Sequence, residues 1–233
     1  MEPKYKRVLL KLSGEALSGN GGIIDFDFTE KMCEVIKKCN DAGVVFGIII
    51  GGGNIWRGRQ GVEVERSRSD QMGMLATAIN SLAVQDVLLK KGASTALMSA
   101  LDIQRIAESY SAHKAVEYMD AGKNVIIACG TGNPHFSTDT AASLRAAELG
   151  VSVILSAKNI DGVYDSDPRL NPDAKKYDFI TYEEIIGKNL KIIDTAAAII
   201  ARDNKIPQVL FALNDPMNIY RVAMGESIGT TVK

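Results

Sequence analysis

Short apolar runs alternate along the chain with longer segments in which apolar residues recur at every third or fourth position. The short runs are rich in valine, isoleucine and leucine and show little polar alternation, which is typical of strands buried on both faces of a parallel sheet. These runs predict strands at residues 7–12, 44–50, 95–99, 124–129, 151–156 and 208–212.

The longer segments carry the signals of helix starts and ends. Several begin with an acidic or hydroxyl residue suited to an N-cap, and some of these have a glutamate three positions later. The expected starts are at Asp27, Ser111, Thr138, Thr181 and Asp194, and the expected terminating glycines are Gly43, Gly122 and Gly150. Because helices follow strands in regular order, right-handed crossovers are expected. The predicted fold class is α/β, a three-layer α/β/α sandwich with a mainly parallel central sheet.

A long helix is expected at residues 70–91, with an apolar stripe at helical spacing. Such a stripe is most often part of the core of the same chain, and the alternative is an interface with another subunit. The stripe consists of Met72, Leu75, Ala76, Ile79, Leu82 and Ala83.

Length, charge and cysteine content narrow the possible functions. The chain has 233 residues, which suits a single domain, and 27 basic against 28 acidic residues leave a net charge of −1. This balance argues against general nucleic-acid binding, which needs a basic face. The continuous apolar runs are too short to cross a membrane, and no secretory signal pattern is expected. Three scattered cysteines do not form a disulfide framework, so a reducing, cytoplasmic location is expected.

Three glycine-containing loops directly follow predicted strands. Glycine lets a backbone approach a ligand closely and point successive N–H groups at an anion. Together with Lys11, Arg57 and Lys158, three such loops at one sheet edge predict a site for several phosphates. A tight strand-to-helix turn also needs glycine, so a structural role remains the alternative for any single loop. The loops are at residues 11–14, 51–54 and 130–134.

The common nucleotide-binding glycine patterns are missing. The sequence G-x-x-x-x-G-K-[ST] does not occur, which excludes a P-loop enzyme. In two candidate G-x-G-x-x-G segments, Trp56 and His135 stand where the third glycine is required. A dinucleotide-dependent oxidoreductase is therefore excluded as well.

Several motifs, in order over essentially the whole chain, resemble the bacterial uridylate (UMP) kinase branch of the amino acid kinase family. The glycine triplet at 51–53 and the D-G-V-Y-x-x-D-P run at 161–168 are typical of the wider family, whereas G-T-G-N-P-x-F-x-T-D at 130–139 is typical of the uridylate branch. The other matching segments are K-L-S-G-E at 11–15, G-G-G-N-I-W-R-G at 51–58 and D-Q-M-G-M-L at 70–75.

The resemblance implies ATP-dependent phosphorylation of UMP to UDP, in pyrimidine nucleotide biosynthesis. It implies one domain over 1–233, in which about 1–150 binds the acceptor and about 151–233 binds ATP. The implied catalytic residues are Lys11, Arg57, Asp139, Lys158 and Asp194, although Asp139 has the alternative role of stabilising a helix start through the helix dipole. The implied ATP contacts are Lys11, Leu12, Ser13, Gly14, Gly53, Arg57, Asn159, Tyr164 and Asp167.

The acceptor site implied by the resemblance combines the second and third glycine loops with Asp70, whose carboxylate is expected to accept hydrogen bonds from the ribose hydroxyls. A phosphate monoester already carries nearly two negative charges at neutral pH, so no general base is required. The implied UMP contacts are Gly52, Asp70, Thr131, Gly132, Asn133, Pro134, His135, Phe136, Ser137 and Thr138.

The resemblance further implies Mg²⁺ bound with ATP, a homohexamer built from dimers, and regulation by GTP and UTP. No protein side chain is assigned to the metal, which would be held by nucleotide phosphates and water. The segment 159–178 is the expected lid over ATP. A flexible turn explains the proposed GTP segment equally well, and this segment consists of Gly19, Asn20, Gly21, Gly22, Ile23 and Ile24.

Two other functions remain possible from the sequence. A kinase of the same fold that phosphorylates a carboxylate, such as that of an amino acid, would not need the 130–139 motif. A nucleotide sensor without turnover would be expected to lack Lys11 or the acidic residues beside it, and these are present.

Overall fold

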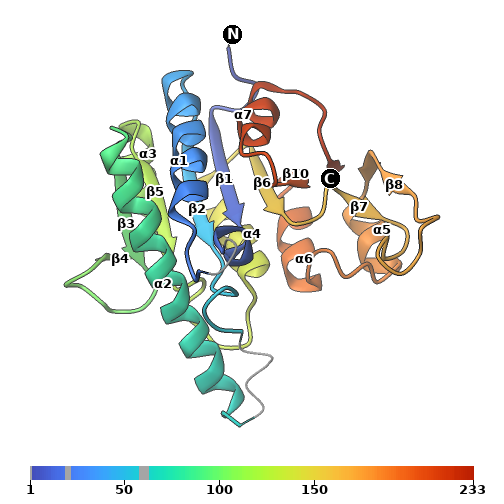
Figure 1. Cartoon of the computed structure of the whole chain (residues 1–233), viewed down its shortest axis with the longest axis horizontal. Helices are drawn as coiled ribbons and strands as arrows, with labels where there is room; N and C mark the ends of the chain where they lie inside the picture. The colour runs from blue at the N-terminus through green and yellow to red at the C-terminus, as the bar shows by residue number, and fades with distance from the viewer. Residues whose placement is uncertain (1, 19–21, 58–62) are drawn as a thin grey trace.

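A nine-stranded sheet forms the centre of the molecule (Figure 1), a computed structural model that describes residues 2–18, 22–57 and 63–233. The strand order is β4-β3-β5-β2-β1-β6-β10-β11-β9, and neighbouring strands are parallel except β10 and β11. The strands are β1 (Arg7–Leu12), β2 (Val45–Ile50), β3 (Thr95–Ser99), β4 (Glu108–Ser109), β5 (Asn124–Ala128), β6 (Val153–Lys158), β9 (Phe179–Ile180), β10 (Gln208–Ala212) and β11 (Thr230–Val232). A separate antiparallel pair, β7 (Val163–Tyr164) and β8 (Lys176–Tyr177), lies within the segment predicted as a lid.

Helices cover both faces of the sheet, and each face has its own apolar cluster. The first cluster packs α1 (Phe26–Asp41), α2 (Arg66–Lys90) and α7 (Met217–Met224) on one face. The second packs α3 (Ala112–Asp120), α4 (Thr138–Leu149), α5 (Tyr182–Gly187) and α6 (Thr195–Asp203) on the other. A short 3₁₀ helix, η1 (Gly14–Leu17), follows β1. The predicted three-layer α/β/α sandwich with a mainly parallel sheet is confirmed.

Three predicted helix starts are wrong. The long helix α2 begins at Arg66 rather than at residue 70, because the Glu65 carboxylate caps it. The other two are wrong by one or two residues. Asp25 rather than Asp27 caps α1, because its carboxylate accepts a hydrogen bond at 3.0 Å from the backbone N–H three residues later. Ser137 rather than Thr138 caps α4 through the equivalent bond at 3.1 Å. The predicted caps Ser111, Thr181 and Asp194 are confirmed, and Thr181 forms a complete capping box.

The large side chains of the predicted α2 stripe face away from the core, whereas its Ala76 is buried. Met72, Leu75, Ile79 and Leu82 are exposed. The buried face combines small and polar residues with the larger apolar residues Met74, Val84, Val87 and Leu88. The interpretation of the stripe as core of the same chain is therefore wrong for its four exposed residues. Among the described residues, α2 is also the one helix long and apolar enough to span a membrane, and half of its most apolar stretch is buried inside the protein.

The central strand β1 marks a change in the direction of the chain across the sheet. After β1 the chain builds β2, β3, β4 and β5 on one side, and it then returns to place β6 on the other. In open α/β sheets, ligands bind at the carboxyl ends of strands beside such a switch point. Lys11 lies near the end of β1, and Lys158 ends β6.

Candidate active site

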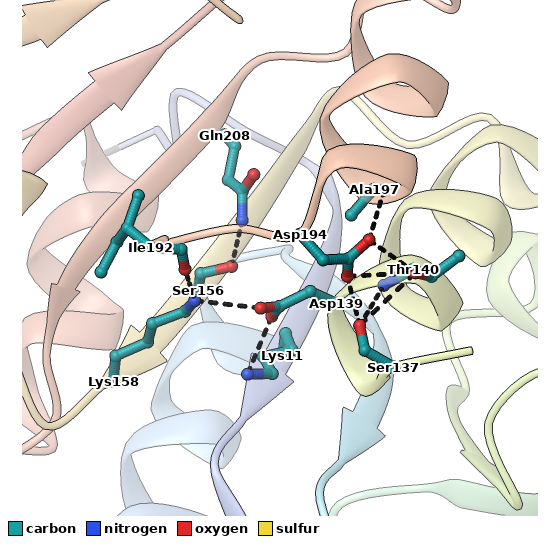
Figure 2. Close-up of polar contacts among 10 residues, drawn as sticks. All are labelled: Lys11, Ser137, Asp139, Thr140, Ser156, Lys158, Ile192, Asp194, Ala197 and Gln208. Carbon is teal, nitrogen blue, oxygen red and sulfur yellow. Dashed lines mark hydrogen bonds and ion pairs between the residues drawn. The ribbon is translucent and has the colours of Figure 1, made fainter. Parts of the chain in front are cut away.

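Two lysines share one aspartate at the carboxyl ends of β1 and β6 (Figure 2). Lys11 Nζ lies 2.9 Å from Asp139 Oδ1, and Lys158 Nζ lies 3.1 Å from Asp139 Oδ2. Lys158 also donates to the backbone carbonyl of Ile192. The three charged side chains are between 10% and 17% exposed, so the structure brings three of the predicted catalytic residues together in a largely buried cluster.

The cluster carries one more positive than negative charge, and both burial and these charges act on the pKa values of Asp139 and Lys158. Burial alone would raise the pKa of Asp139, but the charges of Lys11 and Lys158 outweigh it and hold that pKa well below its usual range. Burial lowers the pKa of Lys158, and the repulsion from Lys11 adds to this shift while Asp139 opposes it. Asp139 therefore stays ionised near neutral pH and is unsuited to act as a base.

Asp139 also lies in the first turn of α4, where a carboxylate interacts favourably with the helix dipole. The structural role considered from the sequence is thus present, and the two ion pairs add a second role. The helix fixes the backbone of Asp139, and the carboxylate in turn fixes both ammonium groups.

Asp194 organises the neighbouring helix starts (Figure 2). Its Oδ1 accepts the backbone N–H of Ala197 at 2.9 Å, which caps α6. The hydroxyl of Thr140 donates to the same carboxylate at 2.9 Å, and that of Ser137 donates to its Oδ2. Asp194 therefore ties α6 to α4 and orients two hydroxyl groups, and no lysine of the cluster bonds to it directly among the hydrogen bonds of the described residues.

A cavity of about 490 Å³ opens beside this cluster. Thr138 and Thr140, on either side of Asp139, line the cavity. Of the predicted UMP contacts, Gly132 and Pro134 are not in the lining, and the others are. These lining contacts are Gly52, Asp70, Thr131, Asn133, His135, Phe136, Ser137 and Thr138.

Asp70 holds the rim of this cavity in place. Its Oδ2 accepts a hydrogen bond from Arg66 Nε at 2.9 Å and another from the backbone N–H of His135 at 2.8 Å. Burial tends to raise the pKa of Asp70, but these two donors lower it overall. Asp70 thus joins α2 to the loop after β5, and its contact with a ribose stays a prediction.

Two of the loop glycines are required by close packing. A Cβ atom on Gly14 would lie 2.4 Å from the carbonyl oxygen of Gly51, and one on Gly52 would lie 2.7 Å from that of Gly73. Glycine is therefore needed at both positions for packing, whether or not a ligand binds there. The nearest atom to a Cβ on Gly53 would be 3.5 Å away, so packing alone does not explain that glycine.

A second cavity, of about 560 Å³, lies between η1, α1 and the ends of β6 and β10. Asn159 lines it, as does Glu15, and Asn159 Nδ2 donates to Glu15 Oε2 at 3.4 Å. Glu15 also forms an ion pair with Arg57, which lines the first cavity. Glu15 therefore connects the two cavities, a role that the sequence analysis missed although Glu15 belongs to the first motif.

The remaining predicted ATP contacts occupy several environments. Leu12 is fully buried in the core, backbone included, so it is not accessible to a ligand in this structure, and Ser13 occupies the N-cap position of η1 without a capping side-chain hydrogen bond. Tyr164 and Asp167 lie in the segment that contains β7 and β8, and neither is in the lining of the two cavities described. Tyr164 donates to Asp161, which does line the second cavity.

Of the proposed GTP segment, Gly19, Asn20 and Gly21 lie outside the described residues. The carbonyl of Ile23 accepts a hydrogen bond at 2.7 Å from Asn54 Nδ2. Asn54 is bonded to Asn80, which donates to the carbonyl of Gly51 at 2.7 Å. A chain of hydrogen bonds thus joins this segment to the second glycine loop. Of the described residues of the segment, Ile23 belongs to this chain, and Gly22 and Ile24 do not.

Comparison of the sequence and the structure with known proteins identifies the family of this chain. The family model described as the amino acid kinase family matches residues 6–212. The chain belongs to the amino acid kinase family. Its structure is similar to that of UMP kinase from Bacillus anthracis, with 37% identity, a TM-score of 0.94, and coverage of 98% of this chain and 96% of that one. UMP kinase from Ureaplasma parvum gives 35% identity, a TM-score of 0.92 and 99% coverage of both chains.

A more distant structure shows how far the fold extends. Uridylate kinase from Archaeoglobus fulgidus is 24% identical, with a TM-score of 0.77 over 97% of this chain and 99% of that one. At this identity the likeness concerns the fold alone. The amino acid kinase fold is therefore retained while most side chains differ.

Proposed function

We propose that this member of the amino acid kinase family is a UMP kinase, which transfers the γ-phosphoryl group of ATP to UMP and yields ADP and UDP. One observation carries the proposal: the Lys11–Asp139–Lys158 cluster adjoins a cavity lined by the 130–139 motif. The two similar UMP kinase structures, matched over nearly their whole length, support it.

The chemistry requires the approach of two negatively charged phosphates. An oxygen of the UMP phosphate attacks the γ-phosphorus, the bond from that phosphorus to the β–γ bridging oxygen breaks, and ADP leaves with the bonding electrons. Lys11 and Lys158 supply positive charge that is already oriented by Asp139, and Arg57 supplies more from the side of the first cavity. Preorganised charge of this kind lowers the barrier because it need not reorient during the reaction.

Magnesium is proposed to enter with ATP. The nearest carboxylates are engaged, since Asp139 pairs with two lysines and Asp194 accepts from Ser137 and Thr140. Such a site fits an ion that takes most of its ligands from phosphate oxygens and water, as Mg²⁺ commonly does. When bound, the ion would neutralise phosphate charge that the lysines and Arg57 leave unbalanced.

A coupled assay of ADP release tests the proposed substrate. Purified protein with Mg²⁺ and ATP is given UMP, CMP, dTMP, glutamate, aspartate or acetylglutamate in turn. We expect rapid turnover with UMP and far slower turnover with the other acceptors. Activity on an amino acid with none on UMP would instead establish the carboxylate kinase considered from the sequence, and binding of UMP without any turnover would establish a sensor.

The apolar stripe of α2 supports a proposal about assembly. The exposed large apolar side chains of α2 are 36% to 51% exposed and recur at spacings of three, four and seven residues, which suits helix-to-helix packing. We propose that α2 packs against its copy in a second subunit, within the homohexamer that the resemblance implies. These exposed residues are Met72, Leu75, Ile79 and Leu82 of the predicted stripe, together with Leu89.

Regulation, location and pathway complete the proposal. GTP and UTP are proposed as effectors, and the hydrogen-bonded chain from Ile23 through Asn54 and Asn80 to Gly51 supports a link between the predicted GTP segment and the site. From the sequence expectations we also propose that the protein is a cytoplasmic enzyme of pyrimidine nucleotide synthesis, with one domain over 1–233. Measuring UMP phosphorylation with and without GTP tests the regulation.

A further inference from the structure

Arg145 is a buried charge next to the acceptor loop, which we define as residues 129–136. It lies on α4 and is only 5% exposed. Its NH2 donates to the carbonyl oxygens of Gly130 at 3.2 Å and Thr131 at 3.4 Å. Arg145 does not line the cavity that these two residues line, so it contacts the loop from behind.

Two further side chains hold the guanidinium group in place. Arg145 NH1 lies 2.8 Å from Glu148 Oε2, and the guanidinium carbon lies 4.1 Å from the centre of the Tyr110 ring. The Tyr110 hydroxyl donates to the same carboxylate oxygen at 2.5 Å. A buried arginine with a matched counter-charge and a stacked ring is held in one orientation, so its remaining donors can fix the loop.

The acceptor loop has an unusual backbone that needs such restraint. Cys129, Gly130, Gly132 and His135 all have φ between 60° and 82°. For Cys129 and His135 this left-handed conformation is strained, and strain of this kind persists only where surrounding contacts impose it. Thr77 Oγ1 accepts the Cys129 N–H at 2.8 Å and Asp70 accepts that of His135 at 2.8 Å. Between them the loop closes on itself, because the Gly132 N–H donates to the carbonyl oxygen of Cys129 at 2.9 Å, and the carbonyl groups of Gly130 and Thr131 are the ones that Arg145 holds.

We propose that Arg145 is a positioning residue for the acceptor, and that it sets the affinity for UMP by fixing the carbonyl groups of Gly130 and Thr131. This inference rests on the proposed function, because it concerns the binding of UMP in the cavity beside the loop. Arg145 acts through the loop backbone and is screened from the acceptor by it. Arg145 is also absent from the lining of the second cavity, which contains Asn159, one of the predicted ATP contacts.

The test compares three variants. Arg145→Met keeps much of the side-chain volume and removes both donors, Arg145→Lys keeps the charge with a single donor group, and Arg202→Met is the matched control on α6, whose arginine is 38% exposed. Initial rates give KM for UMP, KM for ATP and kcat, and calorimetry gives the Kd of UMP. Thermal unfolding of each variant is measured alongside.

For Arg145→Met we expect KM and Kd for UMP to rise about 10- to 100-fold, the scale for loss of hydrogen bonds from a charged donor. KM for ATP should change less than twofold, Arg145→Lys should recover part of the affinity for UMP, and Arg202→Met should match the wild type. An equal rise in both KM values, or no recovery with lysine, would mean a general structural role and would overturn the assignment.

Two milder variants keep the test decisive if Arg145→Met does not fold. Glu148→Gln removes the counter-charge and Tyr110→Phe removes one hydroxyl, while both keep the shape of the cluster. Each should raise KM for UMP less than Arg145→Met and leave KM for ATP unchanged; unaltered UMP affinity in both would overturn the inference. A wild-type protein that neither binds nor phosphorylates UMP overturns the proposed function itself. Normal wild-type activity with an unaltered KM in Arg145→Met overturns this inference alone.

Discussion

Replacing the shared carboxylate tests how the lysine pair is maintained. Asp139→Asn keeps the size of the side chain and leaves Lys11 and Lys158 with no negative charge between them. Because both ammonium groups bond to one carboxylate, they lie within roughly 8 Å of each other, where two unit charges repel by at least about 2 kcal/mol at an effective dielectric constant of about 20. Removing one member of a buried ion pair typically costs about 3–5 kcal/mol, and we expect a loss of stability in that range.

Urea unfolding and thermal melting at pH 7 measure this loss. For a chain of this size the loss corresponds to a fall in Tm of about 6–20 °C. The double variant Asp139→Asn/Lys158→Met should regain part of the stability, because it removes one of the two repelling charges. Asp86→Asn, which breaks an exposed pair with Lys90 on α2, is the control and should cost less than about 1 kcal/mol.

The pH dependence gives an independent check on the same residue. Because the pKa of Asp139 is lowered in the folded protein, its contribution to stability is present above the unfolded value of about 3.9 and is lost as pH falls toward the folded value. Wild-type stability should therefore fall more steeply below about pH 4 than that of Asp139→Asn. Equal stability of the two proteins at pH 7, or parallel pH profiles, would refute the reasoning.

Three further predictions address catalysis, assembly and packing. Lys11→Ala should lower kcat about 10²- to 10³-fold with an unchanged circular dichroism spectrum, and near-normal turnover would remove Lys11 from the mechanism. Leu75→Glu combined with Ile79→Glu should dissociate the α2 contact between subunits, seen as a smaller mass by sedimentation, and an unchanged mass would place the interface elsewhere. Gly14→Ala should destabilise the fold by about 1–3 kcal/mol, because its Cβ would lie 2.4 Å from the carbonyl oxygen of Gly51, and an unaltered melting curve would contradict this.

The acceptor loop shows how much of the site the sequence predicts. The motif at 130–139 follows a strand that is apolar after its first residue, Asn124, so its position at the carboxyl edge of the sheet follows from the pattern alone. Most of its predicted contacts do line the first cavity. The backbone conformation of the loop could not be predicted, because it depends on Thr77, Asp70 and Arg145, which approach it from two other elements. An arginine in the alanine-rich segment 138–149 was the available signal for the last of these.

The sequence by itself determined the alternation of elements, because continuous apolar runs specify strands buried on both faces and capping residues specify helix starts. The bounds of β1, β3 and β10 agree with the prediction for this reason. Only the tertiary structure decided which face of α2 is buried, since an apolar stripe fits a core and a subunit interface equally well. It also decided that Lys11 and Lys158 share Asp139, because side chains far apart in sequence become one electrostatic unit only where strand order and helix docking bring them within 3.1 Å.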